Sequence, residues 1–179
     1  FKQKTAYEMQ RSLGGSEMCI RDSVCTDLHT GDPIYHKCRS GDAEDVRWME
    51  ASASMPLAAK AVRIGHYSLL DGGVADSIPV RFFESLGYKR NLIILTQPKG
   101  FVKKKNPMLP AIRARYLRYP AFVAAVADRH ERYNETLSYI AMQEASGKDY
   151  VIRPPIPLEI GAMERDPAQL CLLYTSDAA

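Results

Sequence analysis

The chain lacks long apolar runs and has few cysteines away from its ends. Its stretch Asn91-Leu92-Ile93-Ile94-Leu95-Thr96 has the length of a strand, far below the about 20 apolar residues that a membrane-spanning helix needs. Of the four cysteines, Cys25 and Cys38 lie in the body of the chain. Two thiols are too few for a disulfide framework, so the fold must be held together by its core.

The composition is that of an ordinary globular protein. Hydrophobic residues make up 46% and charged residues 25% of 179 residues, values that are typical of soluble domains. The 24 basic and 21 acidic residues leave a formal net charge of +3, which excludes few partners. This length predicts one domain.

The two ends have sequences that are related to each other at the DNA level. Residues 18–23, Met-Cys-Ile-Arg-Asp-Ser, back-translate as ATG TGT ATA AGA GAC AG, and residues 171–176, Cys-Leu-Leu-Tyr-Thr-Ser, as TGT CTC TTA TAC ACA TCT. These stretches are reverse complements of each other and look like the adaptor of a sequencing library. We therefore predict that residues 1–23 are an adaptor-derived leader and residues 171–179 an adaptor-derived tail, both excluded from fold reasoning.

The first part of the remaining chain predicts two strands and a helix. Val24 to His36 reads as two short strands around Thr30-Gly31-Asp32-Pro33, because Gly and Pro favour a turn there. Asp42 is a typical N-cap for a helix that runs to Ser54. Pro56 would then stop the helix.

A second helix and a strand follow the middle of the chain. Ser77 is a suitable cap for a helix with Val80, Phe83 and Leu86 on its apolar face, and Gly87 ends it. Residues 91–96 then predict a buried, parallel strand. The order strand, turn, helix, strand indicates an α/β layered domain.

Beyond Thr96 the composition changes to a basic, proline-containing loop or lid. A long helix is expected from near Pro120, with Gly147 near its end, and a short strand over Tyr150-Val151-Ile152. Asp166-Pro167 would cap one more helix, cut off by the tail.

The tripeptide Asp71-Gly72-Gly73 follows an apolar run and is the strongest candidate site. A carboxylate on a glycine turn at a strand end can serve as a general base. The two glycines are expected to permit positive φ and a close approach of substrate or a side chain to the backbone. Asp27 has no such glycine support, which favours a structural hydrogen-bonding role for it.

Several motifs, in order and spacing, make the chain resemble the second half of a patatin-like phospholipase domain. They are Thr26-Asp27-Leu28, residues 51–56 (Ala-Ser-Ala-Ser-Met-Pro) and residues 69–80 (Leu-Leu-Asp-Gly-Gly-Val-Ala-Asp-Ser-Ile-Pro-Val). Five later motifs resemble the C-terminal extension of a bacterial subfamily: Arg115-Tyr116, Tyr119-Pro120, Arg129-His130, Tyr133-Asn134 and Ile152-Arg153-Pro154.

The resemblance implies a fold and a division of the chain. Residues 24–96 would be the C-terminal part of a three-layer α/β/α patatin-like domain. Residues 97–170 would be a mostly helical extension made of the basic loop, the long helix and the short strand.

The resemblance also implies a function, hydrolysis of phospholipids or other acyl esters in lipid metabolism through a Ser-Asp dyad. Asp71 would take the proton of the serine, and Gly72 and Gly73 would support its turn. The G-x-S-x-G nucleophile and the oxyanion loop of that family do not occur in the sequence and are expected upstream of Val24. The chain as written is therefore expected to be an inactive fragment of a bacterial enzyme that is cytoplasmic or peripheral to a membrane.

Two further groups of residues, one of cysteines and histidines and one of basic residues, allow other interpretations. Cys25, His29, His36 and Cys38 cluster in sequence, but their spacing fits no standard zinc site, so no metal or cofactor is expected. Nucleic acid is not an expected partner. Basic residues could contact anionic lipid, although a solvated loop is favoured; they are Lys99, Lys103, Lys104, Lys105, Arg113, Arg115 and Arg118. A lipid- or membrane-associating module without enzymatic activity is the alternative function.

Overall fold

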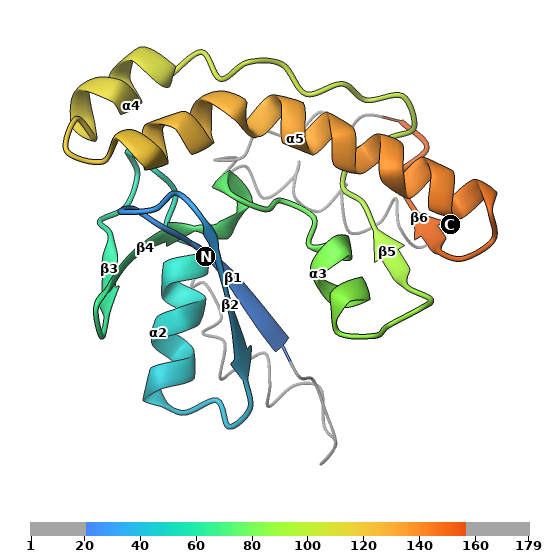
Figure 1. Ribbon diagram of the computed structural model, residues 1–179, viewed down its shortest axis with the longest axis horizontal. Helices are drawn as coiled ribbons and strands as arrows, with labels where there is room; N and C mark the ends of the chain where they lie inside the picture. Colours follow the sequence, from blue (N-terminus) through green and yellow to red (C-terminus); the bar gives the residue numbers. More distant parts are fainter. Residues whose placement is uncertain (1–20, 157–179) are drawn as a thin grey trace, which may run out of the picture. The chain divides into compact units, whose positions relative to one another are not determined.

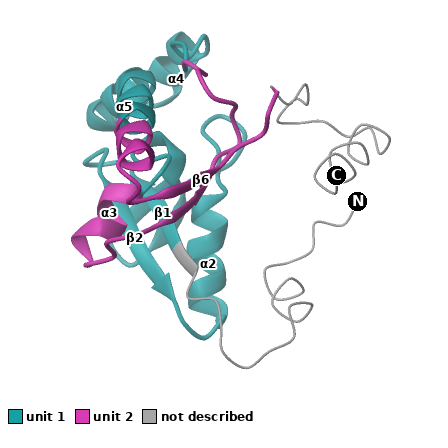
Figure 2. Cartoon of the chain, turned by 90° about the vertical axis from the view of Figure 1, so that its right-hand side faces the viewer, with its two compact units in different colours: residues 1–79, 103–138 teal, residues 80–102, 139–179 magenta. Residues whose placement is uncertain are grey.

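The computed structural model describes residues 21–156 (Figure 1). The chain forms two compact units, coloured separately in Figure 2. Unit 1 comprises residues 1–79 and 103–138, and unit 2 comprises residues 80–102 and 139–179. Each unit is described by itself below.

Unit 1 contains a four-stranded antiparallel sheet with the order β2-β1-β4-β3. Its strands are β1 (Arg21–Asp27), β2 (Pro33–Cys38), β3 (Val62–Ile64) and β4 (Tyr67–Asp71). The pair of strands predicted on either side of residues 30–33 is confirmed. A two-residue turn joins β3 to β4, and Gly65 supplies the positive φ of 57° that such a tight hairpin turn requires.

Helix α2 (Ala43–Ser52) confirms the predicted cap. The side chain of Asp42 accepts hydrogen bonds from the backbone N–H groups of Glu44 and Asp45, at 3.0 and 2.9 Å. One face of α2 packs through Trp48 and Ala51 against the sheet, in a buried cluster that also contains Cys25, Cys38, Ile64 and Leu69. Trp48 is therefore a core residue.

A second buried cluster of unit 1 involves helices α4 (Leu109–Arg115) and α5 (Pro120–Ala145). Phe122, Ala125 and Val126 lie on one face of α5 and share this cluster with Leu70 and Val74. Successive residues of a strand point to opposite faces of the sheet. Leu69 therefore belongs to the α2 cluster and Leu70 to the α5 cluster, and the chain continues from Leu70 directly into Asp71.

Unit 2 contains helix α3 (Val80–Ser85), strands β5 (Leu92–Ile94) and β6 (Tyr150–Ile152), and the last turns of α5. β5 and β6 pair in parallel, as predicted for residues 91–96. The expectation that this strand is buried is wrong, because Leu92 and Ile94 are 63% and 71% exposed and only Ile93 of the strand is buried. Successive strand residues point to opposite faces, so Leu92 and Ile94 lie on the exposed face of this two-stranded sheet and Ile93 on the other.

The α/β class is confirmed, but the three-layer α/β/α patatin-like arrangement is not found in residues 21–156. The larger sheet is small and antiparallel, and the parallel pair has two strands. The antiparallel order of the larger sheet follows from its short connections, because segments 28–32 and 65–66 join neighbouring strands. A parallel pair would need a crossover of about a dozen residues or more.

The predicted ends lie almost entirely outside the described residues. β1 begins at Arg21, so it includes the last three residues of the stretch assigned to the leader. Residues 1–20, the tail over 171–179 and the helix expected after Asp166-Pro167 are not among the described residues. The domain boundaries stay a prediction.

Candidate functional site

Asp71 is the last residue of β4 and the N-cap of the short 3₁₀ helix η1 (Gly72–Val74). Its backbone is held on both sides: the N–H donates to the carbonyl of Ser54 at 2.8 Å, and its carbonyl accepts from the hydroxyl of Thr26 at 2.9 Å. The predicted position of Asp71 at the end of a strand is therefore found. Its catalytic role and the open cleft that it was expected to face stay predictions.

The carboxylate of Asp71 is held through one of its two oxygens. Oδ1 accepts a hydrogen bond of 2.7 Å from the N–H of Gly73. Oδ2 has no hydrogen-bond partner among residues 21–156, and the side chain is partly exposed. One fixed oxygen orients the group and the other can accept a proton, which is the arrangement that a general base needs.

The glycines of the turn are needed for a reason other than positive φ. Neither Gly72 nor Gly73 has a positive φ, so that expectation is wrong. A Cβ on Gly72 would lie 2.1 Å from the carbonyl oxygen of Val24. A Cβ on Gly73 would lie 3.1 Å from Oδ1 of Asp71 and 3.2 Å from Nη2 of Arg129. The second expectation, close approach of other groups to the glycine backbone, is confirmed.

Two arginines of α5 lie beside this turn, and neither was predicted to be a site residue. Nη2 of Arg132 donates to the carbonyl of Val74 at 3.1 Å and also to the carbonyl of Ala125. The guanidinium of Arg129 reaches Gly73. The available sequence signal was helical spacing, because positions 122, 126 and 129 fall on one face of a helix.

Lys103 lies near Arg129 in unit 1. Its backbone N–H and carbonyl are both paired with the side-chain amide of Asn134, at 2.8 and 3.0 Å. Its ammonium group lies 4.5 Å from the ring centroid of Tyr133, a cation–π contact. Burial, and secondly the charge of Arg129, lower the pKa of Lys103. Lys103 thus differs from Lys104 and Lys105, which are exposed as expected for a solvated loop.

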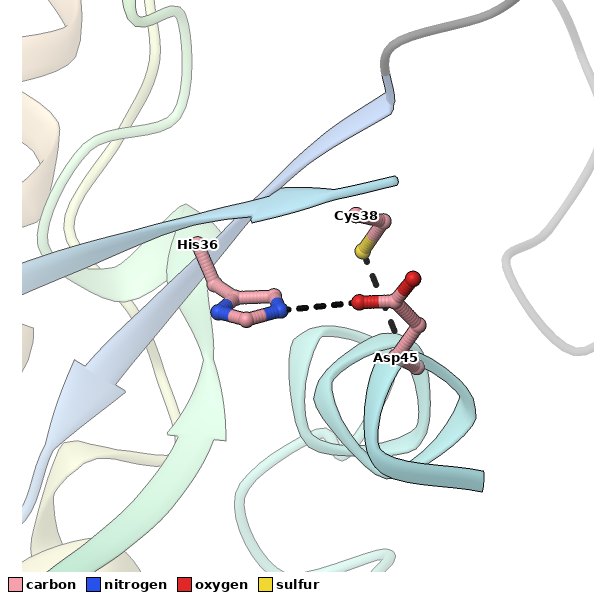
Figure 3. A group of neighbouring side chains, drawn as sticks. All are labelled: His36, Cys38 and Asp45. Carbon is pink, nitrogen blue, oxygen red and sulfur yellow. Dashed lines mark hydrogen bonds and ion pairs between the residues drawn. The ribbon is translucent and has the colours of Figure 1, made fainter. Parts of the chain in front are cut away.

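A second polar group in unit 1 consists of His36, Cys38 and Asp45 (Figure 3), whose possible ligand atoms lie within 4.8 Å of one another. Oδ1 of Asp45 is 3.0 Å from Nε2 of His36. Oδ2 accepts three backbone N–H bonds of 2.9 Å from residues 39, 40 and 41. The ring of His36 stacks on Trp48 with centroids 4.4 Å apart.

Asp45 is fully occupied by these donors. The bond to His36 and those from the loop N–H groups hold the pKa of its carboxyl far below the usual range, although burial opposes them. A metal ion bound by His36 and Asp45 would have to replace the hydrogen bond between them. The geometry therefore fits a structural carboxylate that joins β2 to the start of α2.

The four residues considered for zinc are only partly brought together. His36 and Cys38 meet, whereas Cys25 and His29 are not in the group, and Asp45 was missed. Burial, followed by the Asp71 carboxylate and Cys38, raises the pKa of Cys25 to about 12, so this thiol stays protonated and is a poor ligand or nucleophile. The carboxylate of Asp27 accepts a long bond of 3.4 Å from the N–H of Ser68 and is buried, which agrees with its expected structural role.

Comparison with known proteins gives one family match. Residues 119–176 match the family described as a domain of unknown function, DUF6363. No patatin family matches, so the patatin-like interpretation of the motifs has no support and is wrong. No curated protein matches the chain. The motifs that suggested patatin are short and rich in Gly, Ser and Ala, and such residues specify a turn that unrelated folds also use.

The matched segment begins at Tyr119 and includes α5. It therefore contains both arginines that lie beside the Asp71 turn. None of the helices within residues 21–156 has the length and apolar character needed to cross a bilayer.

Proposed function

We propose that the protein takes part in acyl-ester hydrolysis, with Asp71 as the general base for a serine nucleophile. The observation that supports this is the half-occupied carboxylate: Oδ1 is fixed by the N–H of Gly73, while Oδ2 has no partner among the described residues. The side chain is partly exposed, so a substrate group can reach it.

The chemistry follows from the properties of the two groups. A serine hydroxyl is a poor nucleophile near neutral pH and needs a base within hydrogen-bond distance. Oδ2 of Asp71 takes the proton while the serine oxygen attacks the ester carbon. Asp71 then returns the proton to the leaving alcohol, and water hydrolyses the acyl-enzyme in a second round with the same base.

The proposal assigns the base but not the nucleophile. Within residues 21–156, no serine hydroxyl donates to the carboxylate of Asp71. Ser77, which is close in sequence, donates instead to the carbonyl of Gly73 at 2.6 Å. Ser54 donates to the carbonyl of Glu50 at 2.8 Å.

The experiment uses the protein encoded by the source gene without the predicted adaptor sequences, which we call the uninterrupted reading frame. It is assayed as wild type and as Asp71→Asn. Asparagine keeps the size and can still accept the bond from Gly73, but it cannot take the serine proton. We expect kcat for a short-chain chromogenic ester to fall by about 10²- to 10⁴-fold. Asp128→Asn is the matched control, because Asp128 is exposed on α5 and the same charge is removed there.

The 179-residue chain is assayed beside these proteins and should not turn over the ester. Full activity of Asp71→Asn would reduce Asp71 to a turn residue and overturn the proposal. Turnover by the 179-residue chain would show that the nucleophile lies within that chain.

A further inference from the structure

Arg129 and Arg132 are one helical turn apart on α5, yet their guanidinium groups are satisfied very differently. Arg132 donates two hydrogen bonds to backbone carbonyls, one of them on Val74 of η1. Arg129 has no hydrogen bond or ion pair within residues 21–156. The Nε of both arginines is buried without a partner, so the two differ at their terminal nitrogens. A buried donor without a partner is unfavourable, and a buried charge more so.

Asp71 is the carboxylate nearest to Arg129 at the Gly73 turn, but it forms no ion pair with Arg129, and Lys103 adds a second positive charge nearby. Lys103 lies close enough that the charge of Arg129 helps to lower the pKa of Lys103. No carboxylate among the described residues forms an ion pair with either side chain. Arg129 and Lys103 are two neighbouring, partly buried cations without an ion-pair partner among residues 21–156, which indicates a place where an anion can bind.

The position of Arg129 ties this place to Asp71. Nη2 lies 3.2 Å, and Oδ1 of Asp71 3.1 Å, from the point where a Cβ of Gly73 would be. The absence of that Cβ leaves room for both groups on the same side of the turn. Arg129 does not form an ion pair with Asp71, whose Oδ1 is bound by Gly73.

We propose that Arg129, assisted by Lys103, binds a phosphate group beside Asp71. A guanidinium offers a planar pair of donors that matches two phosphate oxygens, and an adjacent ammonium neutralises the remaining charge. That this phosphate belongs to the ester substrate rests on the function proposed above. The binding itself does not depend on it.

Arg129 is not needed to hold α5 against η1, because Arg132 makes that contact. The contact that fastens η1 to α5 is made by Arg132 through the carbonyl of Val74. The apolar cluster of Phe122, Ala125 and Val126 joins α5 to the same region. A neutral side chain at position 129 would serve the packing equally well, without an unpaired charge.

The first measurement is a calorimetric titration of the full 179-residue chain with inorganic phosphate. Arg129→Gln is expected to weaken binding by about 10-fold or more, because charge-assisted bonds are lost. Arg129→Lys should recover part of the affinity. Arg118→Gln, which removes the same charge from an exposed residue of unit 1, should leave binding unchanged. Circular dichroism verifies that each variant is folded.

A second measurement distinguishes free phosphate from a lipid headgroup. Vesicles of phosphatidylcholine, with or without phosphatidic acid, are sedimented with the same proteins. If the headgroup is the source, phosphatidic acid increases binding, Arg129→Gln removes the increase and inorganic phosphate competes. If free phosphate or a soluble ester is the source, vesicles bind no better with phosphatidic acid, while phosphate still binds through Arg129.

The proposal is overturned if the folded wild-type chain does not bind phosphate, or if Arg129→Gln and Arg129→Lys bind it as well as Arg118→Gln does. If the proposed esterase function is wrong, the measurements give a different pattern. If Asp71 is not a base, Asp71→Asn keeps its esterase activity, whereas phosphate binding through Arg129 persists.

Discussion

Asp45 and Asp71 are carboxylates of the same unit, both bound by backbone N–H groups near the start of a helical segment. Asp45 accepts three backbone N–H bonds on Oδ2 and is bonded to His36 on Oδ1. Asp71 accepts one bond, from Gly73, and Oδ2 stays without a partner among the described residues. Asp45 is buried, whereas Asp71 is partly exposed.

This difference separates a structural carboxylate from one that is available for chemistry. An acid whose oxygens are all occupied stabilises the fold, and its removal leaves several donors unpaired. An acid that is oriented by one bond has an oxygen that can accept a proton from another molecule. The same reasoning separates Arg132, which binds two carbonyls, from Arg129, which binds none.

The largest effect on stability is expected from Gly72→Ala. The new Cβ would lie 2.1 Å from the carbonyl oxygen of Val24 in β1. Gly72 directly follows β4, which pairs with β1, so the two segments cannot separate without disturbing the sheet. We expect a loss of about 3 kcal/mol or more in the free energy of unfolding, measured by urea denaturation. Gly73→Ala is the matched comparison, because the three atoms nearest to its Cβ belong to the side chains of Asp71, Arg129 and Ser77 and not to the backbone. Equal losses in the two variants would contradict the close approach at Gly72.

Asp45→Asn should destabilise the protein by about 2 kcal/mol at neutral pH, since the amide presents N–H groups to donors that need an acceptor. The sign of the pH dependence follows from the lowered pKa of Asp45. The stabilisation is complete above the pKa of the unfolded chain, near 3.8, and is lost as the pH falls further toward the folded pKa.

Urea denaturation at pH 7 and at pH 3 measures this contribution. The wild type should lose more stability between the two pH values than Asp45→Asn does. Identical losses would mean that Asp45 does not contribute through its charged form.

The smallest effect is expected for the two arginines. Arg132→Gln should lower the free energy of unfolding by about 1 kcal/mol, because the carbonyls of Val74 and Ala125 lose their donor. Arg129→Gln removes an unpaired charge and should be neutral or slightly stabilising. Thermal unfolding of both variants in phosphate-free buffer decides this, and a larger loss in Arg129→Gln would assign Arg129 a structural role.

Local signals in the sequence predicted several elements correctly. The Asp42 cap, the turn at residues 30–33, the long helix from Pro120 and the strand at residues 150–152 all depend on residues close to one another in the chain. The end of β4 at Asp71 was likewise indicated by the glycines that follow it. Caps and turns have side-chain preferences that a single sequence carries.

Other features depended on contacts between distant residues. Arg129 reaches Gly73 across 56 positions of the chain, and Asp45 reaches back to His36. The antiparallel order of the sheet is set by which strands meet, and no local pattern specifies it. The prediction that Gly72 and Gly73 supply positive φ was wrong for the same reason. The carbonyl of Val24, which leaves no room for a Cβ at Gly72, belongs to another strand.

The contrast between the two carboxylates is tested most directly with the variants Asp71→Asn and Asp45→Asn. Ester hydrolysis and thermal unfolding are measured for both, in the protein from the uninterrupted reading frame. We predict that Asp71→Asn loses hydrolysis by about 10²-fold or more with little change in unfolding temperature. Asp45→Asn should unfold at a lower temperature and keep the wild-type kcat below that temperature. The reverse pattern, with an active Asp71→Asn or a stable but inactive Asp45→Asn, would contradict the account.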